Sequence, residues 1–177
     1  MKLLVIDVQK GITDERLFEY ESFIKNTANL IETARKNGVE VIYVVHDDGP
    51  GSGFTKGCED FEIADQIAPV ENEKIYTKTI NSSFGNSEFA EYLKQTGEKE
   101  LMITGLQTNF CIDATIKSAF ERGYKVIVPA GTNSTFDNYY MDAETTYRYY
   151  NEMMWPKRFA ECVSIEKAAE MLKKHSG

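Results

Sequence analysis

Short apolar runs alternate with segments of helical periodicity along most of the chain. The runs Leu3–Ile6, Val39–Val45 and Leu101–Thr104 are apolar at nearly every position, which is typical of strands buried on both faces. Ser22–Asn37 and Phe110–Arg122 instead repeat apolar residues at helical spacing and end beside a glycine, as helices do. The same criteria predict further strands over Lys74–Thr77, Tyr124–Val128 and Cys162–Ile165, and further helices over Ser87–Lys94, Asp142–Met154 and Glu166–Lys174.

Strands that alternate with helices in this way predict βαβ units and a parallel sheet. We expect an α/β fold with about six strands in a Rossmann-like, mainly parallel sheet, formed by one domain over residues 1–177. The glycine-rich segment Gly49–Gly53 has neither the dinucleotide-binding pattern nor the P-loop pattern. We interpret it as a mobile loop, with a phosphate-binding role as the alternative.

Composition narrows the class of protein. The 177 residues carry 20 Lys and Arg against 28 Asp and Glu, a net charge of −8, which disfavours nucleic acid and anionic membranes as partners. No window of about 18 apolar residues is present, as a membrane-spanning helix would need. The first apolar run meets a charge at Asp7, too early for a signal peptide. We therefore expect a cytoplasmic protein.

Cysteine and histidine are scarce. The three cysteines, Cys58, Cys111 and Cys162, predict neither a disulfide framework nor a Cys-x-x-Cys metal site. We expect Cys58 to be a surface or packing residue and Cys162 to lie in the core. The two histidines, His46 and His175, exclude any site that needs three imidazoles.

Polar or reactive side chains follow four predicted strands. Asp7 follows the first, His46 the second, Lys78 the third, and Cys111 comes soon after the fourth. Because the carboxyl ends of parallel strands meet at one edge of a sheet, we expect these side chains to converge there.

Cys111 has the strongest chemical signal of this group. It falls in the first turn of a predicted helix, where the partial positive charge and free N–H groups favour a thiolate and can bind an oxyanion. The alternative is a small buried apolar residue. Asp7 has an alternative as a capping residue and Lys78 as a solvent-exposed lysine.

Four sequence motifs resemble a known family. The opening Leu4–Gln9, the segment Lys78–Phe84 and the segment Gly105–Thr115 occur in the order typical of isochorismatase-like cysteine hydrolases, and Ser134–Asp137 is also similar. The resemblance covers nearly the whole chain. It implies a three-layer α/β/α fold with helices on both faces of the sheet.

The resemblance also implies site residues. The matching catalytic triad is Asp7, Lys78 and Cys111. A non-proline cis peptide would join Leu106 and Gln107, and the N–H groups of Gln107 and Cys111 would form the oxyanion hole. In this mechanism Asp7 takes the thiol proton, Cys111 attacks a carbonyl carbon, and water hydrolyses the resulting thioester.

Two departures from the family narrow the activity. Nicotinamidases use a metal site of one Asp and three His, which this chain cannot assemble from His46 and His175. True isochorismatases typically lack the cysteine that is present here as Cys111. We therefore expect a metal-independent hydrolase, without a cofactor, that cleaves a carbon–nitrogen bond of a small molecule. The alternatives are a nicotinamidase without the usual metal site and a redox-sensing or partner-binding module that uses Cys111 as a reactive thiol.

The substrate pocket is predicted only tentatively. We expect Gln9, His46, Phe54 and Phe84 to line it, although Phe54 and Phe84 fit core packing equally well. The aromatic-rich segment 136–155 predicts a subunit interface in a homodimer or homotetramer, with core packing as the alternative.

Overall fold

Seven parallel strands form one sheet in the structure, a computed structural model that describes residues 1–175. Six of them lie in the order β3-β2-β1-β4-β5-β7, and β6 pairs with β4 alone. All pairs are parallel, so the predicted sheet is confirmed. The strands are β1 (Lys2–Ile6), β2 (Glu40–His46), β3 (Lys74–Lys78), β4 (Glu100–Leu106), β5 (Lys125–Pro129), β6 (Asn133–Ser134) and β7 (Glu161–Val163).

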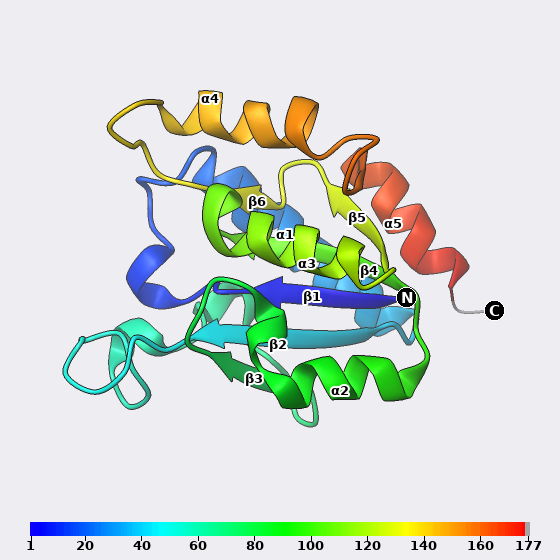
Figure 1. Cartoon of the computed structure of the whole chain (residues 1–177), viewed down its shortest axis with the longest axis horizontal. Coiled ribbons are helices and arrows are strands. Elements are labelled where there is room, and N and C mark those ends of the chain that lie inside the picture. Colours follow the sequence, from blue (N-terminus) through cyan, green and yellow to red (C-terminus); the bar gives the residue numbers. More distant parts are fainter. Residues whose placement is uncertain (176–177) are drawn as a thin grey trace.

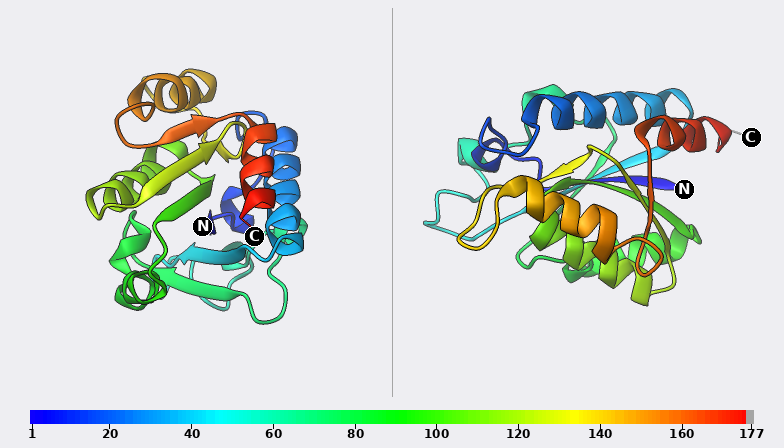
Figure 2. Two further views of the ribbon diagram at one scale, coloured as in Figure 1. Left: turned by 90° about the vertical axis from the view of Figure 1, so that its right-hand side faces the viewer. Right: turned by 90° about the horizontal axis from the view of Figure 1, so that it is seen from above.

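Helices cover both faces of the sheet, which confirms the three-layer fold (Figures 1 and 2). Phe23 of α1 and Leu172 of α5 pack in the core on one face. Phe89 of α2 and Ile116 of α3 pack in the core on the other. The helices are α1 (Tyr20–Lys36), α2 (Ser87–Thr96), α3 (Asp113–Glu121), α4 (Ala143–Arg148) and α5 (Ile165–Lys174), with short helical turns η1 (Lys10–Ile12), η2 (Glu59–Phe61), η3 (Asp65–Ile67), η4 (Ser83–Gly85), η5 (Thr108–Ile112) and η6 (Tyr149–Met154). None of the helices in residues 1–175 has the length and apolar character needed to cross a membrane.

The start of α1 differs from the prediction. Ser22 lies inside the helix, which begins at Tyr20 after Glu19 in a left-handed conformation. The reason is that the Phe23 N–H donates to the Glu19 carbonyl at 2.8 Å, so the first helical turn already contains Ser22. At the other end, Gly38 has a φ of 69°, the conformation expected of a glycine that ends a helix.

The aromatic-rich segment 136–155 divides between core and surface. Trp155 is fully buried and its indole N–H donates to Asp113 Oδ1 at 2.9 Å. Tyr139 and Tyr140 are 93% and 88% exposed. Core packing therefore explains part of the segment, and the homo-oligomeric interface stays a prediction.

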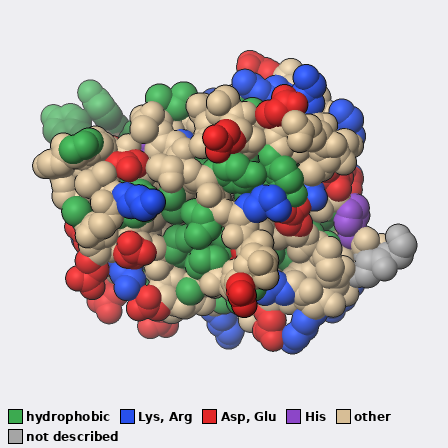
Figure 3. Space-filling model, turned by 90° about the horizontal axis from the view of Figure 1, so that it is seen from below, with side chains coloured by type: hydrophobic (Ala, Val, Ile, Leu, Met, Phe, Trp, Pro, Cys, Tyr) green, Lys and Arg blue, Asp and Glu red, His purple; other side chains and the backbone are tan. Residues whose placement is uncertain are grey.

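The edge strand β3 is partly open to solvent. It is hydrogen-bonded only to β2 among the described strands, and Ile75 in it is half exposed. Figure 3 looks onto this side of the molecule and shows hydrophobic side chains among charged ones. The charged neighbours, including Lys74, blunt an edge that could otherwise pair with another strand.

Candidate active site

The carboxyl ends of β1 and β4 form the centre of the candidate site. The two strands are neighbours, with Ile6 level with Gly105, and the chain completes the β2 side of the sheet before it returns to the β4 side. Ligands of open parallel sheets bind at such a reversal of strand order. Asp7 directly follows β1, and Cys111 lies in the π-helical turn η5 after β4. The expected meeting of strand ends is therefore present.

Lys78 ends β3 and brings a buried ammonium group to the site. Its Nζ lies 2.7 Å from Asp7 Oδ2, 3.3 Å from Cys111 Sγ and 3.1 Å from His46 Nδ1. The Lys78 side chain has no solvent exposure, so its three N–H groups need protein acceptors. The three neighbouring atoms supply them, which excludes the alternative of a solvent-exposed lysine.

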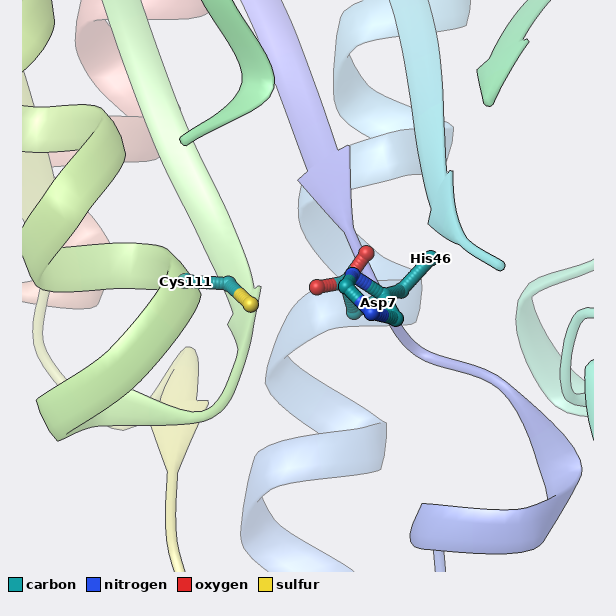
Figure 4. A group of neighbouring side chains, drawn as sticks. All are labelled: Asp7, His46 and Cys111. Carbon is teal, nitrogen blue, oxygen red and sulfur yellow. The ribbon is translucent and has the colours of Figure 1, made fainter. Parts of the chain in front are cut away.

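Asp7 has the features of a buried base. Its backbone takes the left-handed conformation with a φ of 51°, which is strained for a non-glycine residue and recurs at functional sites. Oδ1 is buried and has no hydrogen-bond partner among the described residues. Burial raises the pKa of Asp7, although the positive charge of Lys78 opposes this shift. A carboxylate with a raised pKa is a stronger base, and Figure 4 shows it facing Cys111.

Burial favours the protonated form of the Cys111 thiol. Burial, and then the negative charge of Asp7, raise its pKa to about 12 although Lys78 lowers it. The expectation that the helix start stabilises a resting thiolate is therefore wrong, because desolvation outweighs the nearby positive charge. Sγ also lies 3.8 Å from Asn81 Oδ1, a distance at which a thiol can donate a weak hydrogen bond. Cys111 consequently needs a base to remove its proton, and Asp7 faces it.

His46 is held from two sides. Its backbone N–H donates to Gln9 Oε1 at 2.8 Å, and Gln9 Nε2 donates to the His46 carbonyl at 3.0 Å. Because the Lys78 ammonium can only donate, His46 Nδ1 is the acceptor and the ring proton lies on Nε2. That Nε2 lies 2.9 Å from Asp48 Oδ1. The contacts thus define a chain from Asp48 through His46 to Lys78.

The turn between β4 and Cys111 contains the expected cis peptide bond, between Leu106 and Gln107. Just before it, Gly105 has a φ of 125°, and a Cβ placed there would lie 2.0 Å from the Ile6 carbonyl oxygen. Only glycine lets β4 pass so close to β1. Gln107 is then held through its side chain, whose Oε1 accepts a hydrogen bond from Thr135 at 3.3 Å. The oxyanion role of the Gln107 and Cys111 N–H groups stays a prediction.

A cavity of about 270 Å³ opens beside Cys111. Its size fits a small ligand. Of the four residues predicted to line it, the structure places His46 and Phe54 in its wall. The lining residues are Asp7, Ile12, His46, Asp48, Phe54, Asn81, Gln107, Phe110 and Cys111.

Phe84 and Gln9 do not line this cavity, so the prediction for these two residues is wrong. Phe84 is 7% exposed and its ring packs 5.4 Å from that of Phe89 in the core. Gln9 is fully buried because its side chain is used to hold the backbone of His46. The partner of Gln9, His46, ends β2 and lies 37 residues along the chain, so the sequence around Gln9 does not indicate this contact.

Three side chains of the site could serve as cation ligands. Asp7, His46 and Cys111 each offer one atom, and the three atoms lie within 4.8 Å of one another (Figure 4). The Lys78 ammonium contacts all three residues and so acts as their cation. His175 lies beside Glu98, just before the amino end of β4, whereas the site is at the carboxyl end of that strand, so His175 cannot add a second imidazole.

Four cavity residues were not predicted from the sequence. Asp48 comes two residues after His46, so its place just beyond β2 is the available signal. Phe110 adjoins Cys111 and is half exposed, which its apolar character does not indicate. Ile12 and Asn81 lie in irregular segments whose paths no periodicity defines.

The chain is similar to known proteins over most of its length. A family model for the isochorismatase domain matches residues 2–167. The isochorismatase family protein YrdC of Bacillus subtilis is 32% identical over 154 residues, with 82% of each chain covered. The ureidoacrylate amidohydrolase RutB of Azorhizobium caulinodans is 29% identical over 130 residues, with 57% of each chain covered.

A solved structure supports the fold. The crystal structure of a cysteine hydrolase from Pseudomonas syringae superimposes with a TM-score of 0.90. The superposition covers 99% of this chain and 93% of the other, at 21% identity. At 21% identity, this similarity shows that the two chains share a fold, that is, the same arrangement of helices and strands.

Proposed function

The chain belongs to the isochorismatase domain family, and we propose that it is a cysteine hydrolase that cleaves a carbon–nitrogen bond of a small amide through a thioester on Cys111. One observation carries the proposal: the buried Lys78 ammonium contacts Asp7 Oδ2 at 2.7 Å and Cys111 Sγ at 3.3 Å beside a cavity of about 270 Å³. A base, a cation and a nucleophile in mutual contact are the components that acyl transfer needs. The amidohydrolase name of a relative supports carbon–nitrogen chemistry.

The first half of the proposed reaction forms the thioester. Asp7 removes the Cys111 proton as sulfur attacks the carbonyl carbon, so that a full thiolate never accumulates at rest. The Gln107 and Cys111 N–H groups stabilise the oxyanion of the tetrahedral intermediate. The carbon–nitrogen bond then breaks, and the protonated Asp7 gives its proton to the leaving nitrogen, which departs as ammonia or an amine.

The second half returns the enzyme to its starting state. Asp7 removes a proton from water, and the hydroxide attacks the thioester carbon. The carbon–sulfur bond breaks, a carboxylic acid leaves, and the Asp7 proton returns to sulfur. Lys78 takes no part in these proton transfers, and its contact with Sγ offsets the negative charge that sulfur carries as it leaves.

The redox-sensing alternative needs a thiolate that is present before any substrate binds. The pKa of about 12 for Cys111 opposes that requirement. A base-assisted hydrolase has no such requirement, because its base acts during the attack. The pKa therefore favours the hydrolase.

A panel of small primary amides, including nicotinamide, tests the proposal through ammonia release. We expect the wild-type protein to hydrolyse at least one amide of the panel. We expect Cys111→Ala to hydrolyse none of them. Cys162→Ala is the matched control, because Cys162 is also a partly buried free cysteine but lies in β7. Hydrolysis that persists in Cys111→Ala would contradict the proposal.

A further inference from the structure

The cavity beside Cys111 has an unbalanced negative charge. The Asp7 charge is matched by Lys78, with which it forms an ion pair. Asp48 lies in the cavity wall and its only ion-pair neighbour among residues 1–175 is His46. Because His46 Nδ1 accepts from Lys78, the ring is neutral and leaves the Asp48 charge unmatched.

A second observation points to a ligand that donates hydrogen bonds. Asp7 belongs to the cavity lining; its Oδ1 is buried without a partner at hydrogen-bonding geometry among the described residues, and the neighbouring donor of its carboxyl group is the Cys111 thiol. A buried acceptor without a donor costs free energy unless a ligand or water supplies one. No Lys or Arg is among the described cavity-lining residues.

The rim of the cavity has the same sign of charge. Residues 47–65 connect β2 toward β3 and contain six Asp or Glu residues and one Lys. Figure 1 shows this segment beside the carboxyl ends of β1, β2 and β3. Lys10 is paired with Asp65 of this segment, and Lys56 is the only basic residue within it. An approaching anion would therefore meet acidic groups at the rim and again at Asp48.

The remaining walls are apolar. Phe54, Phe110 and Ile12 line the cavity, and aromatic faces attract cations as well as hydrocarbon groups. A carboxylate-bearing substrate would find no cationic side chain to bind it there, whereas a protonated amine would find both Asp48 and an aromatic wall.

We propose that the substrate is a small amide that carries a protonated amine, which faces Asp48 while its carbonyl carbon faces Cys111. This inference rests on the proposed function for the carbonyl, but its charge selectivity is a property of the cavity and can be measured without hydrolysis. Asp48 is then a specificity-determining residue.

Charged thiol reagents test the selectivity at Cys111 itself. Cationic 2-aminoethyl methanethiosulfonate and anionic 2-sulfonatoethyl methanethiosulfonate both convert a thiol to a mixed disulfide with loss of methanesulfinate. The rate of each reaction is followed by mass spectrometry of the peptide that contains Cys111. The rate with the cationic reagent is divided by the rate with the anionic reagent, and this ratio is normalised to the same ratio measured for 2-mercaptoethanol. We expect a normalised ratio of about tenfold or more in favour of the cation, from the charges at and around the cavity.

Two isosteric variants localise the effect. Asp48→Asn keeps an acceptor for His46 Nε2 and removes the charge, so we expect the ratio to fall several-fold. Asp47→Asn is the matched control: Asp47 is adjacent in sequence, but its carboxylate accepts from the Gly49 N–H at 2.8 Å and is not in the cavity wall. An unchanged ratio in Asp48→Asn, or an equal fall in Asp47→Asn, would overturn the proposal.

A pair of amide probes gives a second measurement that does not depend on thiol reactivity. β-Alaninamide carries an ammonium group and succinamate a carboxylate on chains of similar length. We expect ligand-observed NMR to show binding of β-alaninamide to the wild-type protein, weaker binding to Asp48→Asn, and preference over succinamate. Absence of that preference would overturn the assignment of substrate charge, while ammonia release from other amides would leave the proposed hydrolase intact.

Discussion

The Lys78 ammonium nitrogen lies 3.1 Å from Nδ1 of His46. This contact defines the protonation of the imidazole, because a group that can only donate must meet an unprotonated nitrogen. The other ring nitrogen, Nε2, lies 2.9 Å from Asp48 Oδ1 and carries the proton. The site is therefore organised around one buried cation, and His46 serves as its third acceptor.

We predict that the ring proton of His46 lies on Nε2 and that Nδ1 accepts from Lys78. Long-range ¹H–¹⁵N NMR reads this tautomer directly, and assignment is simple because the chain has only two histidines. His175→Gln removes the other signal and provides the control. A doubly protonated His46 at pH 7, or a proton on Nδ1, would contradict the hydrogen-bond chain.

The raised pKa of Cys111 has a consequence for alkylation. With a pKa of about 12, the fraction of thiolate rises tenfold per pH unit across the neutral range. We predict that the iodoacetamide rate at Cys111, measured on its own peptide, climbs from pH 6 to pH 10 without reaching a plateau. A plateau near pH 7 would show a resting thiolate and refute the protonated state.

The same shift affects stability with a defined sign. The pKa of Cys111 is raised from a model-compound value of 9.0 to about 12 in the folded state, so folding favours the thiol form. That contribution is present below pH 9 and is lost as pH rises from 9 to 12. Urea unfolding at pH 7 and pH 10.5 should show a larger loss of stability for the wild type than for Cys111→Ala. Equal losses in both proteins would count against the shift.

Gly105 should tolerate no side chain. A Cβ there would lie 2.0 Å from the Ile6 carbonyl oxygen, in a backbone conformation that L side chains rarely adopt. We predict that Gly105→Ala costs about 3 kcal/mol or more, because β4 must move away from β1. Gly123→Ala is the control, since Gly123 also has a positive φ but has open space around it, and it should cost only about 1 kcal/mol. Comparable urea midpoints for the two variants would contradict this account.

Substitutions of Phe84 and Phe110 should have different effects, the first on the stability of the fold and the second on substrate binding. Phe84 is buried in the core, so Phe84→Ala should cost about 3–5 kcal/mol of stability. Phe110 is half exposed in the cavity wall, so Phe110→Ala should change stability little and raise KM for the amide found in the panel. Urea unfolding and steady-state kinetics measure the two effects. The reverse pattern would restore Phe84 as a pocket residue.

The sequence predicted the main sheet because its strands are continuous apolar runs, which need both faces buried. It also predicted the meeting of Asp7, Lys78 and Cys111, since parallel strands bring their carboxyl ends to one edge. β6 escaped prediction because Asn133 and Ser134 are polar and too few to show a period. Its position comes from pairing with β4, a relation that local sequence does not contain.

Other errors have the same physical origin. The start of α1 was placed at Ser22 because serine is a common cap, whereas backbone hydrogen bonding begins the helix at Glu19. The resting thiolate was inferred from the helix start at Cys111, but burial decides the pKa. Desolvation depends on the whole fold, and helix position alone does not determine it.

Mass spectrometry of Cys111 during turnover tests the central claim most directly. The protein is mixed with an amide that releases ammonia, quenched with acid within the first turnovers, and digested with pepsin at low pH to preserve thioesters. The account predicts that the peptide containing Cys111 gains the mass of the acyl group, and that hydroxylamine removes the added mass. Ammonia release with an unmodified Cys111, or an acyl group on another residue, would contradict it.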